Sequence, residues 1–210
     1  SSIIVEQADG LVLLEAPLSP TYGSTLVDIA GDTSDKPISH IIQSHHHVDH
    51  ASGVRSVVAT GAELVVGPGV GDLWDQVLTA ESTIRPDALS QAPVDATVHE
   101  VAEGSSLTLD DDLNAITTYS VPGPHALDML VTAINTGEEI IVFNADLYNT
   151  GLGFTLALPG PSILFEALRA TGLLDASCNS ELPMTIVPTH GLALSLPDAL
   201  AEVGASNVGC

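Results

Sequence analysis

The chain alternates between short apolar runs and polar or glycine-containing breaks. The first two runs, Ser2–Gln7 and Leu11–Ala16, flank Ala8-Asp9-Gly10, a turn sequence that predicts a β-hairpin. The later apolar runs have the length of single strands. They predict strands at His40–Ser44, Glu63–Val66, Thr97–Val101, Ser106–Leu109, Ala115–Val121, Met129–Asn135, Glu139–Asn144 and Met184–Val187.

Helices are expected between these strands. They are predicted at Tyr22–Ile29, Asp49–Val58, Leu73–Leu78, Pro161–Thr171 and Pro197–Val203, and Gly61 and Gly172 follow two of them as stop signals. Gly31–Lys36 is predicted to be a polar turn, and Thr79–Ala96 and Tyr148–Gly160 to be long irregular connections. Trp74 is expected in the core. The pattern predicts an α+β fold in which helices flank a sheet-on-sheet core, as a single domain over residues 1–210.

Charge narrows the range of partners. The chain is 45% hydrophobic and has a net charge of −23, because 27 acidic residues face only four basic ones. Such a protein is repelled by phosphate backbones and anionic lipids, so we expect no nucleic acid and no membrane among its partners. No run approaches the roughly 18 apolar residues of a membrane span, and no signal peptide is visible at the N-terminus. A neutral or apolar small molecule is the expected substrate.

Two cysteines, Cys178 and Cys210, lie far from the histidine-rich stretch and form no Cys-x-x-Cys pair. They form either one disulfide that fixes the C-terminus or two separate thiols. A disulfide suits an oxidising compartment, and scarcity of lysine is common in secreted proteins that work in acidic surroundings. Both features favour a secreted or extracellular protein.

The stretch Ser44-His45-His46-His47-Val48-Asp49-His50 concentrates groups that bind metal ions. His45 and His47 are two residues apart, so their side chains lean to the same side of an extended loop. Asp49 and His50 follow where the chain turns into a helix. The stretch can therefore supply ligands to two ions.

The sequence His45-x-His47-x-Asp49-His50 resembles the signature of the metallo-β-lactamase-fold hydrolases. His125, Asp146 and His190 match the remaining ligand positions of that family in the same order. The resemblance implies a four-layer αββα sandwich. Relatives usually begin with one or two strands before the hairpin found here, so those strands are either trimmed or absent. Glu15-Ala16-Pro17 replaces a common Asp-Thr-Gly and is similar to a branch of poorly known substrate.

The resemblance also implies a dinuclear centre. It assigns His45, His47 and His125 to one Zn²⁺ and Asp49, His50 and His190 to a second, with Asp146 bridging both. Iron or manganese can replace zinc at such mixed ligands. A hydroxide bridging the metals would cleave an ester, lactone or related acyl bond, with Asp49 orienting it and passing its proton to the leaving group.

Alternatives stay open within this interpretation. They are β-lactamase-like or phosphodiesterase activity at the same site, and a non-catalytic metal-binding module. Relatives that open β-lactams commonly lack an Asp at the position of Asp146, which argues against the first. Tyr148 is either a substrate contact, as a tyrosine behind the bridging Asp is in lactonase members, or a tyrosine packed at the sheet edge. His46 is expected to point away from the ligands, and His40 and His99 to have structural roles.

Overall fold

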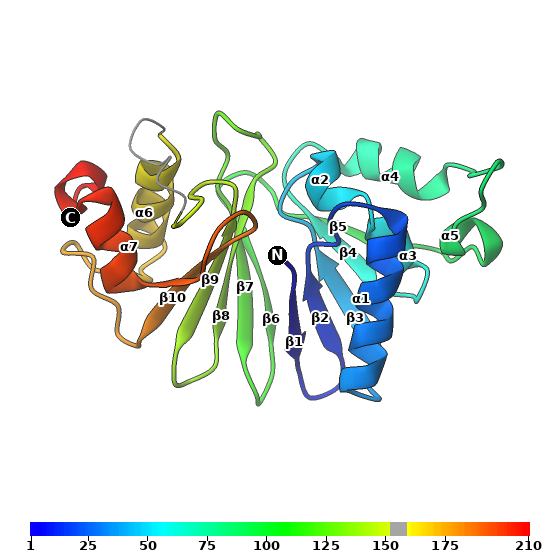
Figure 1. The fold of residues 1–210 in the computed structure, drawn as a ribbon, viewed down its shortest axis with the longest axis horizontal. Helices are drawn as coiled ribbons and strands as arrows, with labels where there is room; N and C mark the ends of the chain where they lie inside the picture. Colours follow the sequence, from blue (N-terminus) through cyan, green and yellow to red (C-terminus); the bar gives the residue numbers. More distant parts are fainter. Residues whose placement is uncertain (152–158) are drawn as a thin grey trace. The chain divides into compact units, whose positions relative to one another are not determined.

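The computed structural model describes residues 1–151 and 159–210. The chain divides into two compact units, Ser1–Glu103 and Gly104–Cys210, each built around one β-sheet. Figure 1 draws the first unit from blue to green and the second from green to red. The single domain expected over residues 1–210 stays a prediction.

The first unit contains a five-stranded sheet in the order β1-β2-β3-β4-β5. Its strands are β1 (Ile3–Glu6), β2 (Leu11–Leu14), β3 (Ile38–Ile42), β4 (Glu63–Val66) and β5 (Val98–Glu100). β1 and β2 form the predicted antiparallel hairpin, whereas β2 through β5 run parallel. Because the carboxyl ends of parallel strands meet at one edge, the loops that follow β2, β3 and β4 gather there.

Helices cover one face of this sheet (Figure 1). They are α1 (Pro20–Thr33), α2 (Val48–Ala51), α3 (Val54–Val58), α4 (Gly71–Thr79) and α5 (Ala88–Gln91). Alternate strand residues, such as Leu11 with Leu13 and Leu64 with Val66, point into the core under the helices. Trp74 on α4 is 3% exposed, which confirms that it belongs to the core.

Helix α1 lies close to α3 because two glycines meet at the contact. A Cβ atom added to Gly23 would lie 2.3 Å from the carbonyl oxygen of Gly53. The amide of Gly53 in turn donates to the carbonyl oxygen of Ala16, 2.7 Å away. This contact fixes the start of α3, and with it the short helix α2 that follows the histidine-rich loop.

The second unit contains a six-stranded sheet in the order β11-β10-β9-β8-β7-β6. Its strands are β6 (Ser106–Asp110), β7 (Ala115–Ser120), β8 (Leu130–Asn135), β9 (Ile140–Ala145), β10 (Met184–Pro188) and β11 (Leu194–Ser195). Neighbouring strands are antiparallel except β9 and β10, which are parallel. The ends of β7, β9 and β10 therefore fall at the same edge of the sheet.

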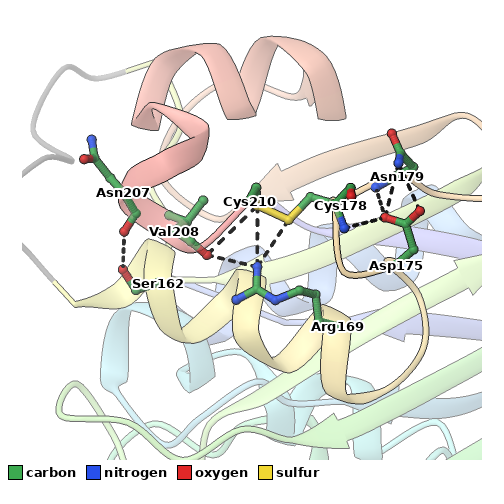
Figure 2. The surroundings of a disulfide bond; sticks show 9 residues. Ser162, Arg169, Asp175, Cys178, Asn179, Asn207, Val208 and Cys210 are labelled. Carbon is green, nitrogen blue, oxygen red and sulfur yellow. Dashed lines mark hydrogen bonds between the residues drawn. A yellow bond between two sulfur atoms is a disulfide. The ribbon is translucent and has the colours of Figure 1, made fainter.

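Helices α6 (Gly160–Ala170) and α7 (Leu196–Val203) lie together at one side of this sheet, followed by a 3₁₀ turn at Ala205–Val208 (Figure 1). A disulfide joins Cys178 to Cys210, with their Cα atoms 5.5 Å apart. Figure 2 shows the Arg169 side chain reaching from α6 toward the bridge, where it donates to the carbonyl oxygen of Val208 at 2.9 Å. Of the two states open to the cysteines, the structure has the disulfide.

Three predicted elements were wrong in extent. The first helix runs to Thr33, so it takes in the first half of the turn predicted at Gly31–Lys36. The helix predicted at Asp49–Val58 is two short helices, because Ser52 and Gly53 interrupt it. The connection at Thr79–Ala96 contains the single-turn helix α5. Most of the loop predicted at Tyr148–Gly160 lies outside the described residues. Within the described residues, no helix has the length and apolar character needed to cross a membrane.

Candidate metal centre

The histidine-rich loop begins directly after β3, at the edge where the parallel strands end. The Gln43 side chain donates to the carbonyl oxygen of His45 at 3.0 Å and so holds the loop against the strand. His45 is buried, His47 is half-buried at the start of α2, and His46 is exposed. The exposure of His46 agrees with the expectation that it lies outside the candidate ligand set, but its ring does not point away from His47, since the two ring centroids are 5.0 Å apart.

Hydrogen bonds determine which nitrogen of His45 carries its proton. The Ser44 hydroxyl donates to the Glu15 carboxylate. Ser44 Oγ, 3.0 Å from His45 Nδ1, then accepts from that nitrogen. The lone pair of His45 is therefore on Nε2, which lies 3.0 Å from Nδ1 of His47. Two ring nitrogens of adjacent ligands thus face one another at a distance that a shared metal ion would explain.

His50 is oriented by the same carboxylate. Its Nδ1 lies 2.8 Å from Oε1 of Glu15, and both side chains are fully buried. A carboxylate that accepts from one ring nitrogen leaves the other, Nε2, as the metal-binding atom and makes it more basic. Glu15, His45 and His50 each offer a ligand atom within 4.8 Å of the others. Glu15 is a candidate functional residue that sequence reasoning missed.

Asp49 lies in the first turn of α2, next to His50. Its side chain is 50% exposed, and Oδ2 is 3.5 Å from Nε2 of His50. The carboxylate therefore lies on the metal-binding side of the imidazole rather than on the Glu15 side. Since it is open to solvent, it is able to contact a substrate or a water molecule.

The second unit holds the three later candidate ligands at one edge of its sheet. Asp146 follows β9 and His190 follows β10, and these strands are parallel. His125 lies in the connection from β7 to β8, whose ends reach the same edge. The amide of Thr189 donates to the carbonyl oxygen of Ala145 at 3.1 Å, which joins the two loops just before their ligands.

Asp146 faces both histidines of this unit, one with each oxygen. Oδ2 lies 3.3 Å from Nε2 of His125, and Oδ1 lies 3.7 Å from Nε2 of His190. The Asp146 side chain is only 10% exposed, whereas the two imidazoles are partly open to solvent. A recess of about 310 Å³ adjoins them, lined by Pro124, His125, Asp146, Leu147, Pro159 and Gly160.

Tyr148 does not reach this recess. It is 1% exposed and packs against Phe165, and its hydroxyl donates to the carbonyl oxygen of Ala199 at 3.2 Å. Burial, together with the nearby Glu202 carboxylate, raises the pKa of the phenol. This placement favours the packing alternative, so we assign Tyr148 no catalytic role.

The donor set fits divalent transition metal ions. Each unit offers imidazole nitrogens and one or more carboxylate oxygens, the ligands that zinc, iron and manganese share. Within the first unit the structure brings His45, His47, Asp49 and His50 together. Within the second it brings His125, Asp146 and His190 together.

Comparisons with known proteins agree with this fold. A family profile described as the metallo-beta-lactamase superfamily matches residues 1–136. Solved structures share the fold. A metallo-β-lactamase from Hirschia baltica superposes with a TM-score of 0.60 at 18% identity, over 96% of this chain and 84% of its own.

Two other solved structures give the same picture. The DIM-1 metallo-β-lactamase exposed to ceftazidime has a TM-score of 0.66 at 15% identity, over 98% of this chain and 83% of its own. The enzyme from Pontibacter korlensis has a TM-score of 0.63 at 18% identity, over 97% and 85%. No curated protein matches the chain. The expected α+β fold of the metallo-β-lactamase type is confirmed.

Proposed function

Because the chain belongs to the metallo-β-lactamase superfamily, we propose that it is a metal-dependent hydrolase that holds two Zn²⁺ ions and cleaves an ester, a lactone or a related acyl bond. His45, His47 and His125 would hold one ion, and Asp49, His50 and His190 the other. Asp146 would contact both. The assignment of ligands from both units to the same ion rests on the order of these residues in the family motif.

The observation that carries a dinuclear centre is the position of Asp146. Its two oxygens approach different imidazoles, at 3.3 and 3.7 Å. The family motif gives these imidazoles to different metal ions. A carboxylate with one oxygen near each imidazole would be able to help hold two ions, which together would supply the chemistry of a dinuclear hydrolase.

Bound zinc ions would supply Lewis acidity toward the scissile carbonyl and a nucleophile at neutral pH. The side chains of the chain supply the rest. Glu15 holds the ring of His50 in one orientation through its 2.8 Å contact. Asp49, half exposed beside His50, would accept the proton of the attacking water and deliver it to the leaving group.

The charge of the chain supports a neutral or apolar substrate. With a net charge of −23 and only four basic residues, the protein repels anionic substrates at long range. The solved relatives are named as β-lactamases. Asp146 instead supports acyl substrates other than β-lactams. Members of the resembled family that open β-lactams commonly lack an Asp at this position.

The test is hydrolysis of a lactone, an aryl ester, a thioester, a phosphodiester and a β-lactam by zinc-loaded protein, with and without chelator. We expect turnover of a lactone or ester that chelator abolishes and zinc restores. Turnover of the β-lactam or the phosphodiester alone would replace the acyl proposal by that activity. Two bound ions with no turnover in any arm would favour the non-catalytic metal-binding module.

Substitution separates the proton role of Asp49 from metal binding. Asp49→Asn should lower kcat about 100-fold or more, the usual contribution of a positioned acid or base, in protein that still holds its zinc. His46→Asn is the matched control within the same loop and should keep full activity. Full activity of zinc-loaded Asp49→Asn would remove Asp49 from proton transfer.

The disulfide supports a further part of the proposal, that the protein works outside the reducing cytosol. A bridge between Cys178 and Cys210 persists only where thiols are oxidised. Thiol titration of protein taken from its native source should find no free cysteine. Two free thiols in that material would argue for an intracellular location.

A further inference from the structure

Three side chains outside the proposed centre converge on neighbouring strands of the first unit. His40 lies on β3, Glu63 on β4 and His99 on β5. His40 pairs with Glu63 across the ladder, and His99 pairs with Val65, two residues beyond Glu63. Because side chains alternate along a strand, all three lie on the same face of the sheet.

This face is the one opposite the helices. Ile41, Leu64 and Val98, each next to one of the three residues, belong to or pack on the core beneath the helices. The three polar side chains are partly exposed, at 22% for His40, 44% for Glu63 and 38% for His99. An ion could therefore reach them from solvent while the sheet backbone holds their spacing.

The distances fit a single metal ion. Oε2 of Glu63 lies 2.5 Å from Nε2 of His99 and 3.8 Å from Nε2 of His40. One ligand atom from each residue lies within 4.8 Å of the other two. Tetrahedral zinc with bonds of about 2.0–2.1 Å places its ligands about 3.3 Å apart. Side-chain rotations that change each spacing by about 1.5 Å or less would form such a site.

Hydrogen bonding prepares His40 as a ligand. Ser39 Oγ donates to the carbonyl oxygen of Leu11 at 3.2 Å, so it accepts from Nδ1 of His40, 3.1 Å away. The lone pair of His40 is then on Nε2 and faces the Glu63 carboxylate. A lone pair directed at an anionic oxygen is unfavourable unless a cation lies between them.

A simple ion pair explains less of this arrangement. Pairing of His99 and His40 with Glu63 near the surface would contribute about 0–1 kcal/mol for each pair. It leaves Nε2 of His40 3.8 Å from the Glu63 carboxylate, beyond hydrogen-bonding distance. The cluster is also separate from the proposed centre. His40 lies in the middle of β3, whereas His45 lies beyond the end of that strand, after a bend at Ser44. The two groups of ligands share no residue.

We propose that His40, Glu63 and His99 bind one divalent transition metal ion, represented here by Zn²⁺, with water completing its coordination. Two imidazoles and one carboxylate are a donor set that zinc accepts with a position left open. The ion would link β3, β4 and β5 across three strands. The ion would therefore be bound by the sheet that leads into the histidine-rich stretch Ser44–His50, and not by that stretch itself.

The test counts zinc in the intact protein after gel filtration, by elemental mass spectrometry. The double variant His40→Gln with His99→Gln should hold one zinc fewer per chain than the wild type. Glu63→Gln, a single change at a partly exposed position, should show the same loss if the double variant folds poorly. His46→Gln removes an imidazole outside both ligand sets and should keep the wild-type count.

Anomalous diffraction at the zinc edge gives a second measurement on wild-type crystals. A peak within bonding distance of His40, Glu63 and His99 is expected. An unchanged zinc count in folded variants, or no peak at these residues at saturating zinc, would overturn the proposal. Hydrolysis is measured in the same variants so that the two sites can be told apart. A variant that loses activity but keeps its zinc count would be affected at the proposed catalytic centre, not at His40, Glu63 and His99.

Discussion

At the scale of single residues, the buried carboxylate of Glu15 contacts two residues of the candidate centre that are distant from it in the sequence. It follows β2, yet it orients His50, 35 positions later, and accepts from the hydroxyl of Ser44. Its own backbone is held at a φ of 62°, a conformation that few residues other than glycine adopt. An unusual backbone conformation of this kind is typical of residues at functional sites.

Replacing Glu15 by Gln should therefore weaken zinc binding by about 10- to 100-fold, as loss of a carboxylate behind a histidine ligand does. The amide keeps the size of the side chain but no longer stabilises the charge distribution of His50. Zinc affinity measured by competition with a chromophoric chelator gives the comparison. Glu6→Gln, in the same hairpin but paired with Lys36 at the surface, should leave the affinity unchanged. An equal effect of both substitutions would contradict the role of Glu15.

Asp87 provides a pH-dependent contact elsewhere in the same unit. Its carboxylate accepts from Nε of Arg55 at 2.6 Å and from Nη2 at 3.0 Å. The Arg55 guanidinium holds the pKa of Asp87 well below its usual range. The folded pKa is thus below the unfolded one of about 3.9, so the stabilisation is complete above that pH and is lost as the pH falls below it.

Asp87→Asn should lower the free energy of unfolding by about 2 kcal/mol at pH 7, since Asn can still cap α5 but carries no charge. The difference from the wild type should shrink as the pH falls from about 5 toward 2. Urea unfolding at a series of pH values measures it. A difference that stays constant over this range would show that the charge of Asp87 is not the source.

At the scale of elements, two glycines of α1 should respond in opposite ways to the same substitution. Alanine normally stabilises a helix by up to about 1 kcal/mol relative to glycine. At Gly31 a Cβ atom meets nothing within 4 Å, so Gly31→Ala should follow that rule. At Gly23 the new methyl group would clash with the backbone of Gly53, so Gly23→Ala should destabilise by about 1–3 kcal/mol. Thermal unfolding of both variants decides, and a stabilising Gly23→Ala would contradict the packing described.

The strands could be predicted more fully than the helices, for a physical reason. Apolar runs such as Glu63–Val66 and Ile140–Ala145 are buried strands with clear polar boundaries. The end of α1 at Gly31, Asp32 and Thr33 lacks an apolar face, so its helical state depends on the preceding turns and is not visible locally.

Only the stretch from His45 to His50 is visible as a cluster in the sequence itself. His125, Asp146 and His190 were assigned through the resemblance to the family, and metal binding by the whole set stays a prediction. Glu15 was missed because only the pairing of β2 with β3 brings it near the loop. His40 and His99 were given structural roles for the same reason. Their common partner, Glu63, is found only once the register of three strands is known.

At the scale of the whole molecule, the net charge should affect stability as well as the proposed choice of substrate. Four basic residues cannot balance 27 acidic ones, and the resulting repulsion favours expanded states. Raising NaCl from about 20 to 500 mM shortens the screening length several-fold. The melting temperature at pH 7 should therefore rise by about 3–6 °C, which corresponds to roughly 1–2 kcal/mol for a chain of this size.

The matched condition is a pH near the isoelectric point of about 4.1, where repulsion is absent. There the same addition of NaCl should leave the melting temperature almost unchanged. Differential scanning calorimetry at the two pH values makes the comparison. An equal shift at both would indicate a salt effect on hydrophobic burial rather than on charge.

The pairing of β2 with β3 has a consequence for how the chain matures. The amide of Glu15 donates to the carbonyl oxygen of Ile42 at 3.0 Å, which aligns the ends of the two strands. A slip of one residue would turn the Glu15 side chain to the other face of the sheet, away from His50. An ion bound at His50 would then stabilise only the correctly aligned chain. During maturation, metal binding would thus select the correctly aligned chains. Misaligned chains would bind less metal and would be more susceptible to proteolysis.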